Sequence, residues 1–101
     1  MPLVKAARLA DLRRHGLAEV QYGQQRYVLC EYGREVHALE GTCPHAGAPL
    51  AQGVLHGRQL VCPWHAWEFD CVTGASDFRP GLSLQKYATR IEGDYVYLEL
   101  P

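Results

Sequence analysis

The chain has 101 residues, the size of one small domain, and 48% of them are hydrophobic while 21% are charged. This composition is ordinary for a soluble globular protein. The formal net charge of −1 gives no electrostatic reason to expect a nucleic-acid partner. We therefore expect a single domain over residues 1–101.

Targeting signals are not recognisable in the sequence. Residues 1–16 have no apolar core and no small-residue cleavage site of the kind that marks a secretory signal. No stretch approaches the roughly 18 apolar residues of a membrane span. These features predict a cytoplasmic protein without a membrane partner. Because thiols stay reduced in the cytosol, the four cysteines are expected as metal ligands or buried thiols rather than as disulfides.

Basic residues gather near the start of the chain, where Lys5, Arg8, Arg13 and Arg14 outnumber the single acidic residue Asp11. The ordinary interpretation of such a cluster is a solvated face. The alternative is a docking patch for a partner.

The first part of the chain predicts one short helical turn and then strands. The turn lies within residues 9–16, because Leu9 and Leu12 are spaced i, i+3 and Gly16 is a stop signal. Strands with turn signals between them are predicted at residues 18–22, 26–32 and 35–40.

The end of the chain predicts a β-hairpin. Residues 82–92 and 95–100 form its strands, and Gly93 and Asp94 form its turn. Antiparallel strands at both ends of the chain indicate a small sandwich or a barrel-like base. The intervening residues 41–81 are rich in glycine and proline and predict a loop-rich subdomain. A loop-rich stretch of this length needs something to hold it together, and a metal centre would do so.

Two motifs in this subdomain each carry one sulfur and one imidazole: Cys43-x-His45, then sixteen residues, then Cys62-x-x-His65. Either motif alone would be read as a buried cysteine beside a surface histidine. Together they predict a metal site. Tetrahedral zinc could take this donor set, but zinc modules usually pair like with like. Mixed motifs suit two irons a few ångströms apart, as in a 2Fe–2S cluster with two histidine ligands.

The stretches "CPHAGAPLAQG" and "CPWHAWEFDCVTG" resemble the two cluster-binding loops of Rieske-type ferredoxins, and the "F-D-x-x-T-G" tail and the final hairpin are similar too. The resemblance covers about residues 35–100. It implies an all-β fold in which three antiparallel sheets form a base with a loop-rich cluster-binding subdomain. It implies one 2Fe–2S cluster, with Cys43 and Cys62 on the buried iron and His45 and His65 on the exposed iron.

Two departures from the family's other branches are informative. Some Rieske proteins brace the cluster with a disulfide between the loops, but the corresponding positions here are Ala48 and Trp64. This difference favours the soluble-ferredoxin or oxygenase branch. High-potential members also place serine and tyrosine hydroxyls near the cluster, where this chain has Trp67 and Phe69. We therefore expect a potential at the low end of the Rieske range, which spans about −150 to +300 mV.

Other residues of the loops and strands receive structural interpretations. Cys30 and Cys71 are expected as packed thiols, and Pro80 and Gly81 as part of a third loop that covers the cluster. Trp64 is expected either to expose its ring near the cluster or to fill the space of the missing disulfide.

A four-ligand cluster has no open position for substrate, so the resemblance implies an electron-transfer protein with no catalytic residue of its own. The first interpretation is a carrier from a reductase to a terminal oxygenase, monomeric and docking transiently. The alternative is the small subunit of an assimilatory NAD(P)H nitrite reductase, docking on its large subunit. A third possibility is a zinc-stabilised module without a redox role.

Overall fold

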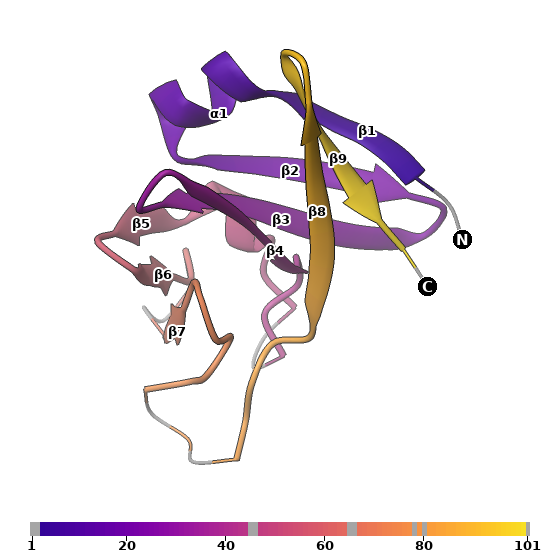
Figure 1. The fold of residues 1–101 in the computed structure, drawn as a ribbon. Coiled ribbons are helices and arrows are strands. Elements are labelled where there is room, and N and C mark those ends of the chain that lie inside the picture. The colour runs from indigo at the N-terminus through magenta and orange to yellow at the C-terminus, as the bar shows by residue number, and fades with distance from the viewer. Residues whose placement is uncertain (1–2, 45–46, 65–66, 78, 80, 101) are drawn as a thin grey trace.

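The computed structural model describes residues 3–44, 47–64, 67–77, 79 and 81–100. Within these residues the chain forms nine strands, one α-helix and one short 3₁₀ helix, arranged as in Figure 1. Their bounds are β1 (Leu3–Arg8), α1 (Leu9–His15), β2 (Leu17–Tyr22), β3 (Gln25–Tyr32), β4 (Glu35–Glu40), η1 (Leu50–Gln52), β5 (Val54–His56), β6 (Gln59–Val61), β7 (Glu68–Asp70), β8 (Lys86–Glu92) and β9 (Tyr95–Glu99).

The strands form antiparallel sheets, which confirms the predicted all-β class. One group is β2, β3, β4 and β8, and a second is β1, β9 and β8. Because β8 pairs with both β4 and β9, these two groups are continuous and the strand order is β1-β9-β8-β4-β3-β2. The third group is a small separate sheet of order β5-β6-β7, on the side of the base away from α1 (Figure 1).

The predicted hairpins and turn signals agree with the structure at most positions. β2, β3, β4 and β9 lie within one residue of the predicted bounds, whereas β8 begins at Lys86 rather than at residue 82. The helix is longer than one turn, since α1 has seven residues. Its end follows the prediction, because Gly16 adopts a φ of 83° and its N–H donates to the Leu12 carbonyl at 2.7 Å.

The prediction did not include β1, and it treated the subdomain at 41–81 as loops without naming strands. β1 pairs with β9, but its register shifts between Lys5 and Ala7, so its sequence lacks clean alternation. The strands β5, β6 and β7 have three residues each, too few to show a period of two.

The central strands β3 and β4 are buried on both faces and separate two hydrophobic clusters. Val28 and Cys30 of β3, with Leu39 of β4, belong to the cluster on the side of the small sheet. Leu29 of β3 and Ala38 of β4 belong to the cluster that α1 and β9 cover. Because successive side chains of a strand point to opposite faces, one pair of strands supports both halves of the molecule.

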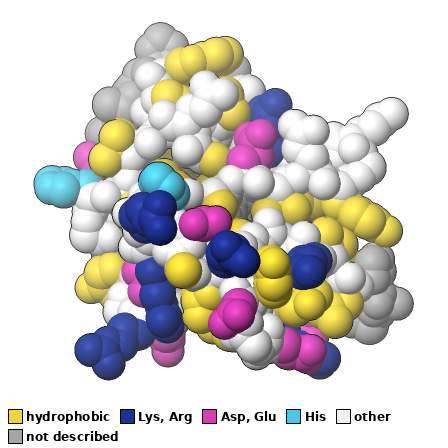
Figure 2. Space-filling model, turned by 90° about the horizontal axis from the view of Figure 1, so that it is seen from above, with side chains coloured by type: hydrophobic (Ala, Val, Ile, Leu, Met, Phe, Trp, Pro, Cys, Tyr) yellow, Lys and Arg dark blue, Asp and Glu magenta, His cyan; other side chains and the backbone are white. Residues whose placement is uncertain are grey.

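The basic residues near the N-terminus are not a uniform solvated patch. Lys5 Nζ lies 3.9 Å from the centre of the Tyr95 ring, and the Arg8 guanidinium lies 6.0 Å from it. On the face that carries α1 and the tip of the β8–β9 hairpin, basic, acidic and apolar side chains are interspersed (Figure 2). None of the helices among the described residues is both long and apolar enough to cross a membrane.

Candidate metal centre

Cys43 and Cys62 lie in separate loops, one after β4 and one after β6, and both are almost completely buried. Each loop is closed by a backbone hydrogen bond across its motif. The Cys43 N–H donates to the Ala48 carbonyl at 2.8 Å, and the Cys62 N–H donates to the Trp67 carbonyl at 2.7 Å. These bonds hold each loop closed without a disulfide.

The two thiols face one another across the gap between the loops. Burial raises the pKa of the Cys62 thiol, and its hydrogen bond with the Cys43 thiol raises this pKa further. The Trp64 N–H, which donates to Cys62 Sγ at 3.4 Å, acts in the opposite direction. A buried thiol that resists ionisation, as Cys62 does, is deprotonated once a metal cation binds its sulfur. The donor chemistry of this site therefore fits iron bound between the two loops.

A glycine brings the first loop against the second. A Cβ on Gly53 would lie 1.9 Å from the carbonyl oxygen of Val61, the residue immediately before Cys62. No side chain fits in this contact. Because the φ of Gly53 is one that any residue can adopt, glycine is required here for its small size and not for its backbone conformation. The packing at Gly53 holds the end of the first loop next to the start of the second.

The two predicted histidine ligands, His45 and His65, lie outside the described residues. Within the described parts of the chain, no group of three or more His, Cys, Asp or Glu side chains is arranged to hold a metal ion. The structure thus brings together the two predicted cysteines.

The residues predicted to stand in place of the loop disulfide and of the hydroxyl groups occupy different environments. Ala48 and Phe69 are completely buried, and Trp67 packs on the same cluster as Cys43 and Cys62. Trp64 is 50% exposed, which agrees with the interpretation that its ring faces outward rather than filling a cavity.

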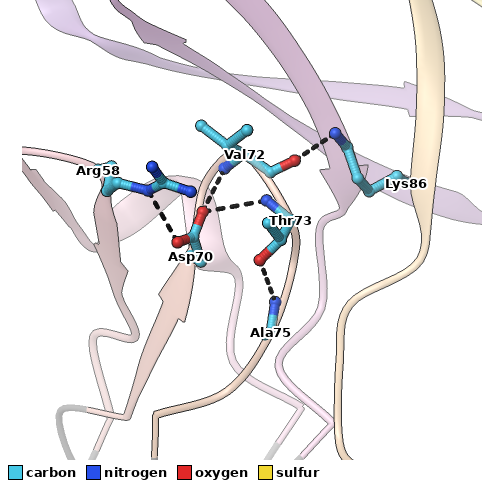
Figure 3. Close-up of polar contacts among 6 residues, drawn as sticks. All are labelled: Arg58, Asp70, Val72, Thr73, Ala75 and Lys86. Carbon is cyan, nitrogen blue, oxygen red and sulfur yellow. Dashed lines mark hydrogen bonds and ion pairs between the residues drawn. The ribbon is translucent and has the colours of Figure 1, made fainter.

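Asp70, for which no role was predicted, organises the turn after β7 (Figure 3). Its carboxylate accepts hydrogen bonds from the Val72 N–H at 2.7 Å, from the Thr73 N–H at 3.0 Å and from Arg58 Nε at 2.8 Å. Burial alone would raise the pKa of Asp70, but the hydrogen bonds from Arg58, Thr73 and Val72 hold it below its usual value. The "F-D-x-x-T-G" sequence, in which Asp70 is the aspartate, could have predicted this turn.

The other two cysteines also meet. Cys30 of β3 and Cys71 of the Asp70 turn are completely buried, and their thiols are hydrogen-bonded to each other. Both were expected as packed thiols, and both are packed. Their pairing was not predicted.

Two buried thiols that converge from separate loops are a donor set that suits a protein with a metal–thiolate centre. The profile of the family described as "Rieske [2Fe-2S] domain" matches residues 3–88. The chain belongs to this family, and its cofactor is a Rieske-type 2Fe–2S cluster. The match begins at Leu3, so it includes the N-terminal strands, which the sequence analysis placed largely outside the resemblance.

Two curated relatives show how the domain occurs in other proteins. The chain is 42% identical over 89 residues to human apoptosis-inducing factor 3, a match that covers 87% of this chain but only 15% of that protein. It thus spans about one seventh of the length of this relative. It is 36% identical over 81 residues to the ferredoxin component of a 2,4-dinitrotoluene dioxygenase system from Burkholderia sp. strain RASC, covering 79% of this chain and 78% of the relative.

Solved structures have the same fold. The ferredoxin of carbazole 1,9a-dioxygenase from Nocardioides aromaticivorans superposes with a TM-score of 0.85 at 27% identity, over 97% of each chain. A chain from a complex of reduced oxygenase and oxidised ferredoxin of carbazole 1,9a-dioxygenase matches with a TM-score of 0.85 at 26% identity, over 95% of this chain and 91% of the other. A protein described as the small subunit of an NADPH nitrite reductase has a TM-score of 0.80 at 19% identity, over 99% and 100%, which shows the shared fold alone.

Proposed function

We propose that this chain is a one-electron carrier in which Cys43, His45, Cys62 and His65 bind the cluster. The observation that carries the proposal is the convergence of two buried thiols, Cys43 and Cys62, from separate loops. Cys43 and Cys62 would hold the inner iron, and the histidine two or three residues after each cysteine would hold the outer iron. When bound, the cluster accepts and donates single electrons.

The chain's own residues set the conditions at the site. The loops exclude water from the sulfurs, since Cys43 and Cys62 are 1% and 2% exposed. The Trp64 N–H donates to Cys62 Sγ and stabilises negative charge there. Neither Phe69 nor Trp67 carries a hydroxyl group to donate to the sulfurs. These features support a low-potential carrier.

We propose a reductase as the electron donor and a terminal oxygenase as the acceptor, in the cytoplasm and with transient docking. The ferredoxin relative supports this assignment over the nitrite reductase alternative, because it is 36% identical whereas the nitrite reductase neighbour is 19% identical. The four free cysteines suit a reducing compartment. The half-exposed Trp64 ring, two residues after Cys62, would lie in the docking surface. We also propose that residues 1–101 form one domain whose cluster-binding part is about 41–81.

Metal analysis with electron paramagnetic resonance (EPR) tests the proposal. The purified protein should be brown, should hold iron and acid-labile sulfide in equal amounts, and should give a rhombic EPR signal when reduced. His65→Ala and His45→Cys should change or abolish this signal. His56→Ala is the matched control, because His56 is an exposed residue of β5 outside both motifs. A colourless zinc protein, or an unchanged signal in both histidine variants, would contradict the proposal.

A further inference from the structure

The second cysteine pair, Cys30 and Cys71, is separate from the proposed ligand set and has no part in the carrier function above. Both residues are completely buried in the same hydrophobic cluster as Cys43 and Cys62. Their thiols lie within hydrogen-bonding reach of each other. Cys30 belongs to the central strand β3 of the base, whereas Cys71 belongs to the turn that follows β7 of the small sheet. The contact therefore joins the two sheets.

The turn that carries Cys71 is tightly held on both sides of that residue (Figure 3). The Cys71 N–H donates to the Arg58 carbonyl at 2.7 Å, and the Asp70 carboxylate binds the next two backbone N–H groups. Lys86, the first residue of β8, donates from Nζ to the Val72 carbonyl and so ties the turn to the base. These bonds keep the Cys71 sulfur against Cys30.

The environment makes Cys71 the more readily ionised member of the pair. The hydrogen bond from Cys30, together with the charges of Lys86 and Arg58, lowers the pKa of Cys71 against the opposing effects of burial and of Asp70. The same hydrogen bond raises the pKa of Cys30, which keeps its proton. The turn that carries Cys71 reaches solvent at Thr73, which is exposed. Because Cys71 is completely buried, a small oxidant reaches its sulfur when this turn opens locally.

We propose that Cys30 and Cys71 form a second redox-active pair, which a peroxide converts to a disulfide between β3 and the turn after β7. The Cys71 sulfur attacks one oxygen of hydrogen peroxide, the O–O bond breaks, one water leaves and Cys71 becomes a sulfenic acid. The Cys30 sulfur then attacks the Cys71 sulfur, the S–O bond breaks and a second water leaves. The two thiols lose two electrons and two protons in total, and one peroxide becomes two waters.

This disulfide would stabilise the cluster-binding subdomain from a different position than the disulfide between the cluster loops, which this chain lacks. Ala48 and Trp64 cannot be cross-linked, so no covalent bond joins the two cluster loops. A bond between Cys30 and Cys71 would instead attach the small sheet, which precedes and follows the Cys62 loop, to the base. Oxidation would thus brace the cluster-binding subdomain without using a ligand.

Peptide mapping of the intact holoprotein tests this proposal. The protein is treated with one equivalent of hydrogen peroxide, unfolded, alkylated and digested with trypsin and a glutamate-specific protease. Cleavage after Glu68 separates Cys62 from Cys71, and cleavage after Arg26 and Glu31 releases Cys30 in a short peptide. We expect a linked peptide pair that contains Cys30 and Cys71, a fall from four alkylated cysteines to two, and retention of the visible absorption of the cluster.

Three results would overturn the proposal: no linked pair, a link that involves Cys43 or Cys62, or a link between Cys30 and Cys71 that forms only after the cluster has bleached. Two matched variants test the assigned order of attack. In Cys30→Ala, a dimedone label should trap the sulfenic acid on Cys71, whereas in Cys71→Ala no label should appear on Cys30. Labelling of Cys30 in the second variant would refute the assignment of Cys71 as the attacking thiol. None of these outcomes depends on the electron partners of the cluster.

Discussion

The two cysteine pairs of this molecule differ in what surrounds them, although all four sulfurs lie in one hydrophobic cluster. Cys43 and Cys62 come from loops closed by backbone hydrogen bonds, and burial disfavours the thiolate of Cys62. Cys30 and Cys71 come from a central strand and a braced turn, and basic groups stand near Cys71. The comparison shows that one hydrophobic core can hold a cysteine pair suited to binding a metal cluster and a second cysteine pair suited to forming a disulfide.

The largest expected effect is loss of the cluster when one of its two cysteine ligands is replaced. Cys43→Ala or Cys62→Ala removes one of two ligands from the inner iron, so these variants should lose iron, acid-labile sulfide and colour. Cys30→Ala and Cys71→Ala are the matched controls, because they remove an equally buried sulfur from the same hydrophobic cluster. Iron and sulfide analysis of the four purified variants measures the difference. A colourless Cys71→Ala protein would show that the two pairs are not separable.

The second effect concerns stability after oxidation. A disulfide between Cys30 and Cys71 closes a loop of roughly 40 residues, which constrains the unfolded chain by about 4 kcal/mol. We expect the thermal midpoint of the oxidised holoprotein to rise by ~15 °C or more over that of the reduced protein. Circular dichroism before and after treatment with a phosphine reductant measures this shift. An unchanged midpoint in a fully cross-linked sample would indicate that the bond strains the native turn.

A third effect tests the turn that holds Cys71. Asp70→Asn weakens the bonds to Arg58, Val72 and Thr73, and should cost about 1–2 kcal/mol near neutral pH. Because the pKa of Asp70 is lower in the folded protein, its contribution is fully present above the unfolded value of about 4. The contribution is lost as the pH falls through the folded value.

The difference in stability between wild type and Asp70→Asn should therefore shrink below about pH 4. Denaturant melts over a pH series measure it. Asp77→Asn is the control, since Asp77 is exposed and its carboxylate has no hydrogen bond or ion pair within the described part of the chain. A gap between wild type and Asp70→Asn that stays constant with pH would refute the role assigned to the carboxylate.

The smallest expected effect is a change in the midpoint potential of the cluster. We expect a midpoint potential near the low end of the Rieske range, about −150 mV. Phe69→Tyr adds a hydroxyl group at the position that we interpret as matching the tyrosine of high-potential family members. A hydrogen bond worth about 1.4 kcal/mol more in the reduced state would raise the potential by about 60 mV. Protein-film voltammetry measures both values, and a wild-type midpoint above zero would contradict the interpretation of Trp67 and Phe69.

Much of the fold follows from local sequence signals. The alternation in β9 and the turn at Gly93, whose φ is 61°, identify the last hairpin. The signal failed where it was irregular or short, at the bulge between Lys5 and Ala7 and in the three-residue strands of the small sheet. Pairing with distant strands, rather than local preference, determines those segments.

The site shows the same division between local and long-range information. Cys43 and Cys62 could be chosen from spacing alone, because each stands in a short motif with a histidine. The contact between Cys30 and Cys71 could not, since nothing near either residue marks the other. The role of Asp70 required the pairing of β6 with β7, which places Gln59 opposite Asp70 and so brings the adjacent Arg58 within reach of its carboxylate.

The burial of β3 on both faces has a consequence for mutagenesis of this strand. Val28 and Leu29 are neighbours in the chain, yet one side chain packs toward the cysteines and the other toward α1. Conservative replacements along β3 should therefore alternate in effect. A change at Val28 alters the packing around the cysteines, and a change at Leu29 alters the packing under α1.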